Sequence, residues 1–132
     1  MTQLADRIPV AEPVYGAPVL DELSPLHRAL RRDIPDVYKG FQALHSAAFT
    51  PGALDVKTKE LIAFAIAVVE HCDGCIASHA QAAVRAGATE QEAAEAIGVA
   101  FLMNGGPATI YGPRAFAAFC EFRATLLDRG VA

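Results

Sequence analysis

The 132-residue sequence contains no tryptophan, only three cysteines and no cluster of basic residues. Its longest wholly apolar run, 61–69, is about half of the roughly 20 residues that a bilayer-spanning helix needs. The formal net charge is -4 and the Lys and Arg residues are scattered, so we expect neither a membrane nor a nucleic acid as partner. The first residues lack the basic head, apolar stretch and cleavage site of a secretory signal, which predicts a cytoplasmic protein.

Apolar residues are abundant, because they make up 53% of the chain whereas charged residues make up 20%. A chain of this length can form one domain that buries roughly two-thirds of its unfolded surface without a disulfide or a metal. So high an apolar fraction predicts that part of the folded surface is covered by other copies of the chain. We therefore expect a homo-oligomer.

Helical patterns follow one another along the sequence, and no segment has a convincing strand pattern. Residues 1–22 carry three prolines with little periodicity and predict an extended N-terminal arm, followed by a single domain over 23–132. The domain is predicted to be all-α with about six helices. The helix boundaries are predicted from Ser24-Pro25, Pro35, Asp55, Gly87, the capping box of Thr89 and Glu92, the break at 104–107, and the last start after Pro113.

Two thiols and an imidazole lie close together in the segment Cys72-Asp73-Gly74-Cys75-Ile76-Ala77-Ser78-His79. On a helix that advances about 100° per residue, Cys72, Cys75 and His79 share one stripe. Cysteines spaced in this way can form a disulfide with little backbone movement, and the start of a helix favours the thiolate. In a reducing cytoplasm, such a pair is more typical of catalysis or metal binding than of a structural bridge.

Glu60 lies in the helix that precedes this segment, beside the apolar run 61–69. If the chain turns near Glu70 and His71, an antiparallel helix hairpin places Glu60 opposite His79. A carboxylate, an imidazole and a thiol would then follow one another, which is the order by which a base activates a nucleophile. We predict Glu60, Cys72, Cys75 and His79 as the catalytic residues.

Two alternatives stay open at this stage. A structural or sensory zinc site would need two further ligands from His71, His79 and Cys120. A non-redox lyase or isomerase would use Glu60 and His79 as acid and base, with the cysteines incidental. Cys120 lies among phenylalanines and is predicted to be a small buried apolar residue.

The pattern of Glu60, eleven residues, Cys72-x-x-Cys75, three residues and His79 resembles the alkylhydroperoxidase-like (AhpD-like) branch of the carboxymuconolactone decarboxylase family. The likeness spans about residues 40–125 and includes the segment 96–107 followed by Tyr111-Gly112-Pro113. The resemblance implies a helical bundle that forms homotrimers, or homohexamers built from them.

The resemblance also implies an antioxidant, peroxiredoxin-type activity. The cysteine pair would cycle between dithiol and disulfide while it reduces a hydroperoxide, with Glu60 and His79 as proton relay, a thiol or disulfide as electron donor, and no cofactor. We expect Cys75 to attack the peroxide and Cys72, as the cysteine nearer solvent, to resolve the disulfide and meet the reductant, although the roles could be reversed. Some family members carry a histidine inside the cysteine pair, where this chain has Gly74. The decarboxylase branch of the same family acts without a redox cysteine pair, so it is an alternative against which the two cysteines of this chain weigh.

Overall fold

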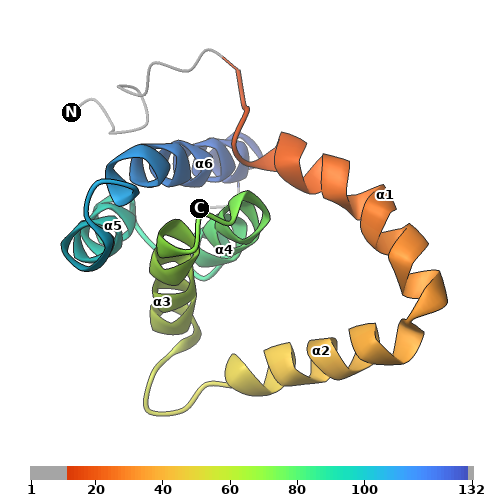
Figure 1. The fold of residues 1–132 in the computed structure, drawn as a ribbon. Helices are drawn as coiled ribbons and strands as arrows, with labels where there is room; N and C mark the ends of the chain where they lie inside the picture. Colours follow the sequence, from red (N-terminus) through yellow and green to blue (C-terminus); the bar gives the residue numbers. More distant parts are fainter. Residues whose placement is uncertain (1–11, 131–132) are drawn as a thin grey trace.

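The computed structural model describes residues 12–130, which contain six α-helices and no strand (Figure 1). This confirms the all-α prediction. The helices are α1 (Ala17–Asp33), α2 (Pro35–Ala48), α3 (Val56–Val69), α4 (Asp73–Arg85), α5 (Glu90–Asn104) and α6 (Ala108–Asp128).

Helices α3 to α6 form the bundle that contains the core. Most of the buried side chains are alanines, and the largest fully buried ones are Phe64, Val68 and Phe119. Small residues allow the helix backbones to approach closely, and a few large side chains fill the remaining space. Gly112 of α6 belongs to this packing, because a Cβ there would lie 2.6 Å from the ring of Phe101.

The predicted central hairpin consists of α3 and α4. Helix α3 ends in a tight turn in which His71 adopts a left-handed conformation with φ of 55°. The amide of His71 donates to the carbonyl of Val68 and the amide of Cys72 to that of Ala67, each at 3.2 Å. These bonds satisfy carbonyls at the helix end and reverse the chain direction. From Cys72 onward, the chain therefore runs back alongside α3.

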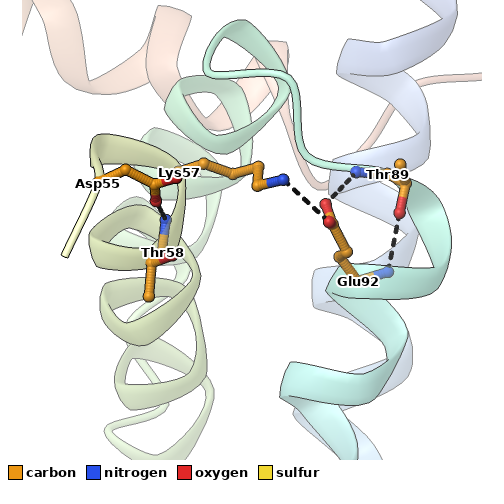
Figure 2. Close-up of polar contacts among 5 residues, drawn as sticks. All are labelled: Asp55, Lys57, Thr58, Thr89 and Glu92. Carbon is orange, nitrogen blue, oxygen red and sulfur yellow. Dashed lines mark hydrogen bonds and ion pairs between the residues drawn. The ribbon is translucent and has the colours of Figure 1, made fainter.

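The predicted caps of α3 and α5 are confirmed, and one ion pair joins them (Figure 2). The carboxylate of Asp55 accepts a hydrogen bond from the amide of Thr58 at 2.8 Å. In α5, the hydroxyl of Thr89 accepts from the amide of Glu92, whose carboxylate accepts from the amide of Thr89. The ammonium of Lys57 lies 3.0 Å from Glu92 Oε1, so the starts of the two helices are held together.

Helices α1 and α2 together form a curved arm that starts beside α6 and returns to α3 (Figure 1). Neither helix has a buried residue. The start of the arm is fixed by Glu121 of α6, whose carboxylate accepts hydrogen bonds from the amides of Val14, Tyr15 and Gly16. The far end is fixed by Lys59 of α3, whose ammonium donates to the carbonyls of Ala48 and Thr50.

The structure corrects two predicted helix starts. Helix α1 begins at Ala17 and continues through Pro25, so Ser24 is not the N-cap of this helix. Residues 17–22, which we expected to belong to an extended N-terminal segment, are therefore helical. Likewise, α6 begins at Ala108 and contains Pro113. Both prolines are exposed, so the carbonyls that lose a helical donor can bind water instead. The expectation for residues 1–11 lies outside the described residues.

Candidate redox site

The hairpin brings Glu60 of α3 and His79 of α4 into contact, as the sequence predicted. His79 Nδ1 lies 2.7 Å from Glu60 Oε2. Glu60 is only 4% exposed, so its carboxylate is held in a largely apolar environment with the imidazole as its polar partner. The bond fixes the orientation of the ring and leaves Nε2 available for another group.

Cys72 and Cys75 lie at the start of α4, and their sulfur atoms are joined in a disulfide with the Cα atoms 5.2 Å apart. Cys72 is the N-cap residue, and its sulfur accepts a hydrogen bond from the amide of Cys75 at 3.3 Å. A thiolate at this position would gain from the same amide and from the helix dipole. Cys75 is exposed whereas Cys72 is partly buried, which reverses the expected solvent access of the two cysteines.

Cys75 and His79 lie one helical turn apart on α4, so their side chains project from the same face. No hydrogen bond joins the imidazole of His79 to either sulfur in this disulfide form. The arrangement therefore contains a short carboxylate–imidazole pair beside a redox-capable sulfur pair.

Two aromatic residues near His79 were missed by the sequence analysis. His45 and Phe49, at the C-terminal end of α2, have ring centroids 6.3 Å and 5.8 Å from that of His79, with nearly parallel planes. Their spacing of four residues places them on one helical face. The sequence contains this four-residue spacing, but nothing in the sequence indicates that the end of α2 returns to the start of the hairpin.

Gly74, between the two cysteines, lies under Leu23 of α1. A Cβ at position 74 would lie 2.8 Å from the Cδ1 atom of Leu23. The absence of a histidine here thus has a packing reason, because any larger side chain would have to displace Leu23. The contact also places α1 directly over the start of α4.

The remaining zinc-ligand candidates are not brought to this site. Cys120 is buried in α6, and desolvation, followed by the charge of Glu90, raises the pKa of its thiol to about 12. His71 stacks on Tyr111 instead of approaching His79, with ring centroids 4.5 Å apart. Within residues 12–130, no group of three or more His, Cys, Asp and Glu side chains is arranged to hold a metal ion.

Residues 35–119 match the model of the carboxymuconolactone decarboxylase family. This match covers nearly two-thirds of the chain. The chain belongs to this family. It is 42% identical to a family protein from Legionella pneumophila, whose crystal structure superposes with a TM-score of 0.77 over 80% of this chain and 94% of that one.

A second family protein of known structure, from Thermotoga maritima, is 32% identical, with a TM-score of 0.65 over 79% of this chain and 94% of that one. A role in the antioxidative response has been suggested for that protein. An uncharacterized protein of Cupriavidus necator is 37% identical over 80% of this chain and 93% of its own length. In the described part of the chain, no helix is both long enough and apolar enough to span a membrane.

Proposed function

We propose that this protein is a cytoplasmic thiol-dependent hydroperoxide reductase, or a disulfide reductase, of the AhpD-like branch of its family. The observation that carries the proposal is the Cys72–Cys75 disulfide beside the buried hydrogen bond between Glu60 and His79. The antioxidative role suggested for the Thermotoga relative supports the same activity.

The reaction begins with the dithiol form. The thiolate of Cys75, the more exposed cysteine, attacks the O–O bond of a hydroperoxide and becomes a sulfenic acid, and the alkoxide leaves as an alcohol after it takes a proton. His79, oriented by Glu60, receives the thiol proton and returns it to the leaving oxygen. Cys72 then attacks the sulfenic sulfur, which releases water and forms the disulfide. Two electrons and two protons from an external thiol pair regenerate the dithiol.

A stoichiometric oxidation tests this proposal. The reduced protein is mixed with one equivalent of tert-butyl hydroperoxide, and intact mass, free thiols, bound metal and the disulfide-linked peptides are measured. We expect the loss of two hydrogens and a Cys72–Cys75 bridge, with Cys120 still reduced because its thiol is buried and has a raised pKa. Cys72→Ser should react once and stop as a sulfenic acid, Cys75→Ser should not turn over, and Cys120→Ala should behave as wild type.

Other results would count against the redox proposal. Stoichiometric zinc on the purified protein would favour the metal-binding alternative. Lyase or isomerase activity that survives the loss of both Cys72 and Cys75 would favour the acid–base alternative, because Glu60 and His79 could carry it alone. A dominant disulfide that includes Cys120 would contradict the pairing.

We further propose that the functional form is a homotrimer or a homohexamer. Large apolar side chains remain exposed on the arm and on the bundle, among them Phe41 (68%), Leu102 (83%) and Met103 (75%). A monomeric protein rarely leaves so much apolar surface in water. An antioxidant assembly of this kind would need no cofactor beyond its own cysteines.

A further inference from the structure

A cavity of about 400 Å³ lies at the start of α4, between α4, α6 and the segment that leads into α1. Ligand sites for small molecules fall in this range of volumes. The apolar part of its wall comes from Val14, Val19 and Ile76, and Ile76 is almost fully buried. Neither Glu60 nor His79 lines the cavity, so it is separate from the proton relay.

The cavity lies beside the start of α4, which carries the disulfide. His71 and Asp73, the residues on either side of Cys72, both line it, and so does Ile76, which follows Cys75, whereas neither cysteine lines it. A ligand held here would lie next to the backbone that carries both sulfur atoms. The cavity is therefore placed to position a reactant of the cysteine pair.

The polar groups of the cavity favour an anion. The guanidinium of Arg114 lies 5.5 Å from the centroid of the Tyr111 ring, and among residues 12–130 no carboxylate forms an ion pair with it. The carboxylate of Asp73 opposes an anion, but it already accepts a hydrogen bond from the amide of Gly74 at 2.7 Å and lies in the first turn of α4, where the helix dipole offsets negative charge. Within the described part of the chain, Arg114 is thus a cation of the cavity wall that no carboxylate neutralises.

His71 provides a second, independent observation. Among the described residues, it is the only one other than glycine with a positive φ. It lies at a helix end, where glycine is the usual choice because the left-handed conformation is costly for other residues. Its imidazole stacks on Tyr111 in the cavity wall, with the planes only 7° apart. A glycine would make the turn without strain, so the turn itself does not account for the side chain.

We infer that this cavity binds a small organic carboxylate, with the carboxylate at Arg114 and the apolar body against Val19 and Ile76. The inference rests on the proposed function and names its substrate class: one of the two reactants of the cysteine pair carries a carboxylate. The reactant is either the hydroperoxide or the thiol that reduces the disulfide. The His71 and Tyr111 rings form the flat wall beside the ligand.

Binding alone gives the first test and does not depend on catalysis. Titration calorimetry of the oxidised protein with octanoate should show saturable binding, and Arg114→Gln should weaken it roughly tenfold or more, the scale of a lost hydrogen bond to a charged group. Arg85→Gln, at an exposed arginine of α4, is the matched control and should bind octanoate as wild type does. Octanamide, which lacks the charge, should bind all three proteins equally. His71→Gly should fold at least as stably as wild type and bind octanoate more weakly.

Separate half-reactions then identify the reactant. Thiol oxidation is timed with a hydroperoxy fatty acid and its methyl ester, and disulfide reduction with 3-mercaptopropionate and 3-mercaptopropanol. We expect the carboxylate compound to react faster in one of the two half-reactions, Arg114→Gln to remove that preference, and Arg85→Gln to keep it. No saturable octanoate binding, equal binding by Arg114→Gln, or no carboxylate preference in either half-reaction would overturn the inference. Failure of every hydroperoxide to oxidise the thiols would instead contradict the proposed hydroperoxide reductase activity, and octanoate binding would still be measurable.

Discussion

At the scale of single residues, Glu60 is the feature that packing explains least. A carboxylate that is 4% exposed in an otherwise apolar helix is costly unless a polar partner compensates it, and His79 is that partner. The pair could be predicted from sequence because Glu60 and His79 lie at similar distances on either side of the turn at Glu70 and His71, ten residues before it and eight after it. His45 and Phe49 could not, since their approach to His79 depends on the path of the arm.

Glu60→Gln tests whether the pair transfers protons. Glutamine keeps the shape and can still hydrogen-bond to His79, so the protein should fold with its helix content unchanged. Peroxide turnover should fall by about 10²-fold or more, the usual effect of a lost acid–base group. Iodoacetamide alkylation of Cys75 at neutral pH should also slow, because the imidazolium that favours the thiolate loses its carboxylate. Both rates are measured against pH.

Glu70→Gln is the control for this experiment, because Glu70 is exposed at the end of the same helix. It should leave turnover and alkylation as in wild type. If Glu60→Gln has the same turnover and alkylation profile as wild type, Glu60 is only a structural partner of His79 and the proposed relay is wrong.

At the scale of helices, local signals fixed most boundaries. Asp55, the Thr89 and Glu92 capping box, and Gly87 with its φ of 90° lie at helix ends as expected, because each satisfies backbone groups or turns the chain locally. Pro25 and Pro113 misled the prediction because a helix can pass a proline at an exposed position, where water replaces the missing donor. Whether a position of a helix is exposed is a tertiary property that the local sequence does not contain.

Glu92 gives a prediction at this scale. The backbone amide of Thr89, and then the ammonium of Lys57, hold the pKa of the Glu92 carboxyl below its usual value. A carboxyl group whose pKa is lowered in the folded state stabilises the protein at pH values above its unfolded-state pKa, which is 4.5 for this group. This stabilisation is lost as the pH falls through the folded-state pKa. Glu92→Gln keeps the capping geometry and removes the charge. It should lower stability at pH 7 and have little effect in strong acid.

The effect should be at most about 1 kcal/mol, because the Glu92 side chain is 35% exposed and water screens its ion pair. Thermal unfolding of wild type and Glu92→Gln between pH 7 and pH 3 measures it. Glu95→Gln, at an exposed position on the same helix, should show no comparable loss at pH 7. A difference between Glu92→Gln and wild type that stays constant across this range would mean that the charge is not responsible.

At the scale of the whole molecule, the arm formed by α1 and α2 carries more apolar side chains than its contacts within one chain can bury. Val37, Phe41 and Leu44 of α2 are all more than 60% exposed and lie on one side of the helix. On the bundle, Ile62, Ile66, Val99 and Met103 line an apolar groove between α3 and α5. The composition predicted such surfaces, but not where they would lie, since that depends on how the helices pack.

Phe41→Asp tests whether the arm takes part in assembly. Light scattering of the wild-type protein at micromolar concentration should give three or six times the 13.9 kDa of one chain. A charge at position 41 would have to be desolvated at an interface, so Phe41→Asp should dissociate the assembly, whereas Gln42→Asp, at a neighbouring exposed position, should have a smaller effect. Because His45 of α2 and Phe49, which follows this helix, lie beside His79, turnover should fall in the dissociated variant while Glu60 and His79 remain paired. A monomeric wild-type protein would contradict the assembly proposal, and an assembly that Phe41→Asp leaves intact would show that α2 lies outside the interface.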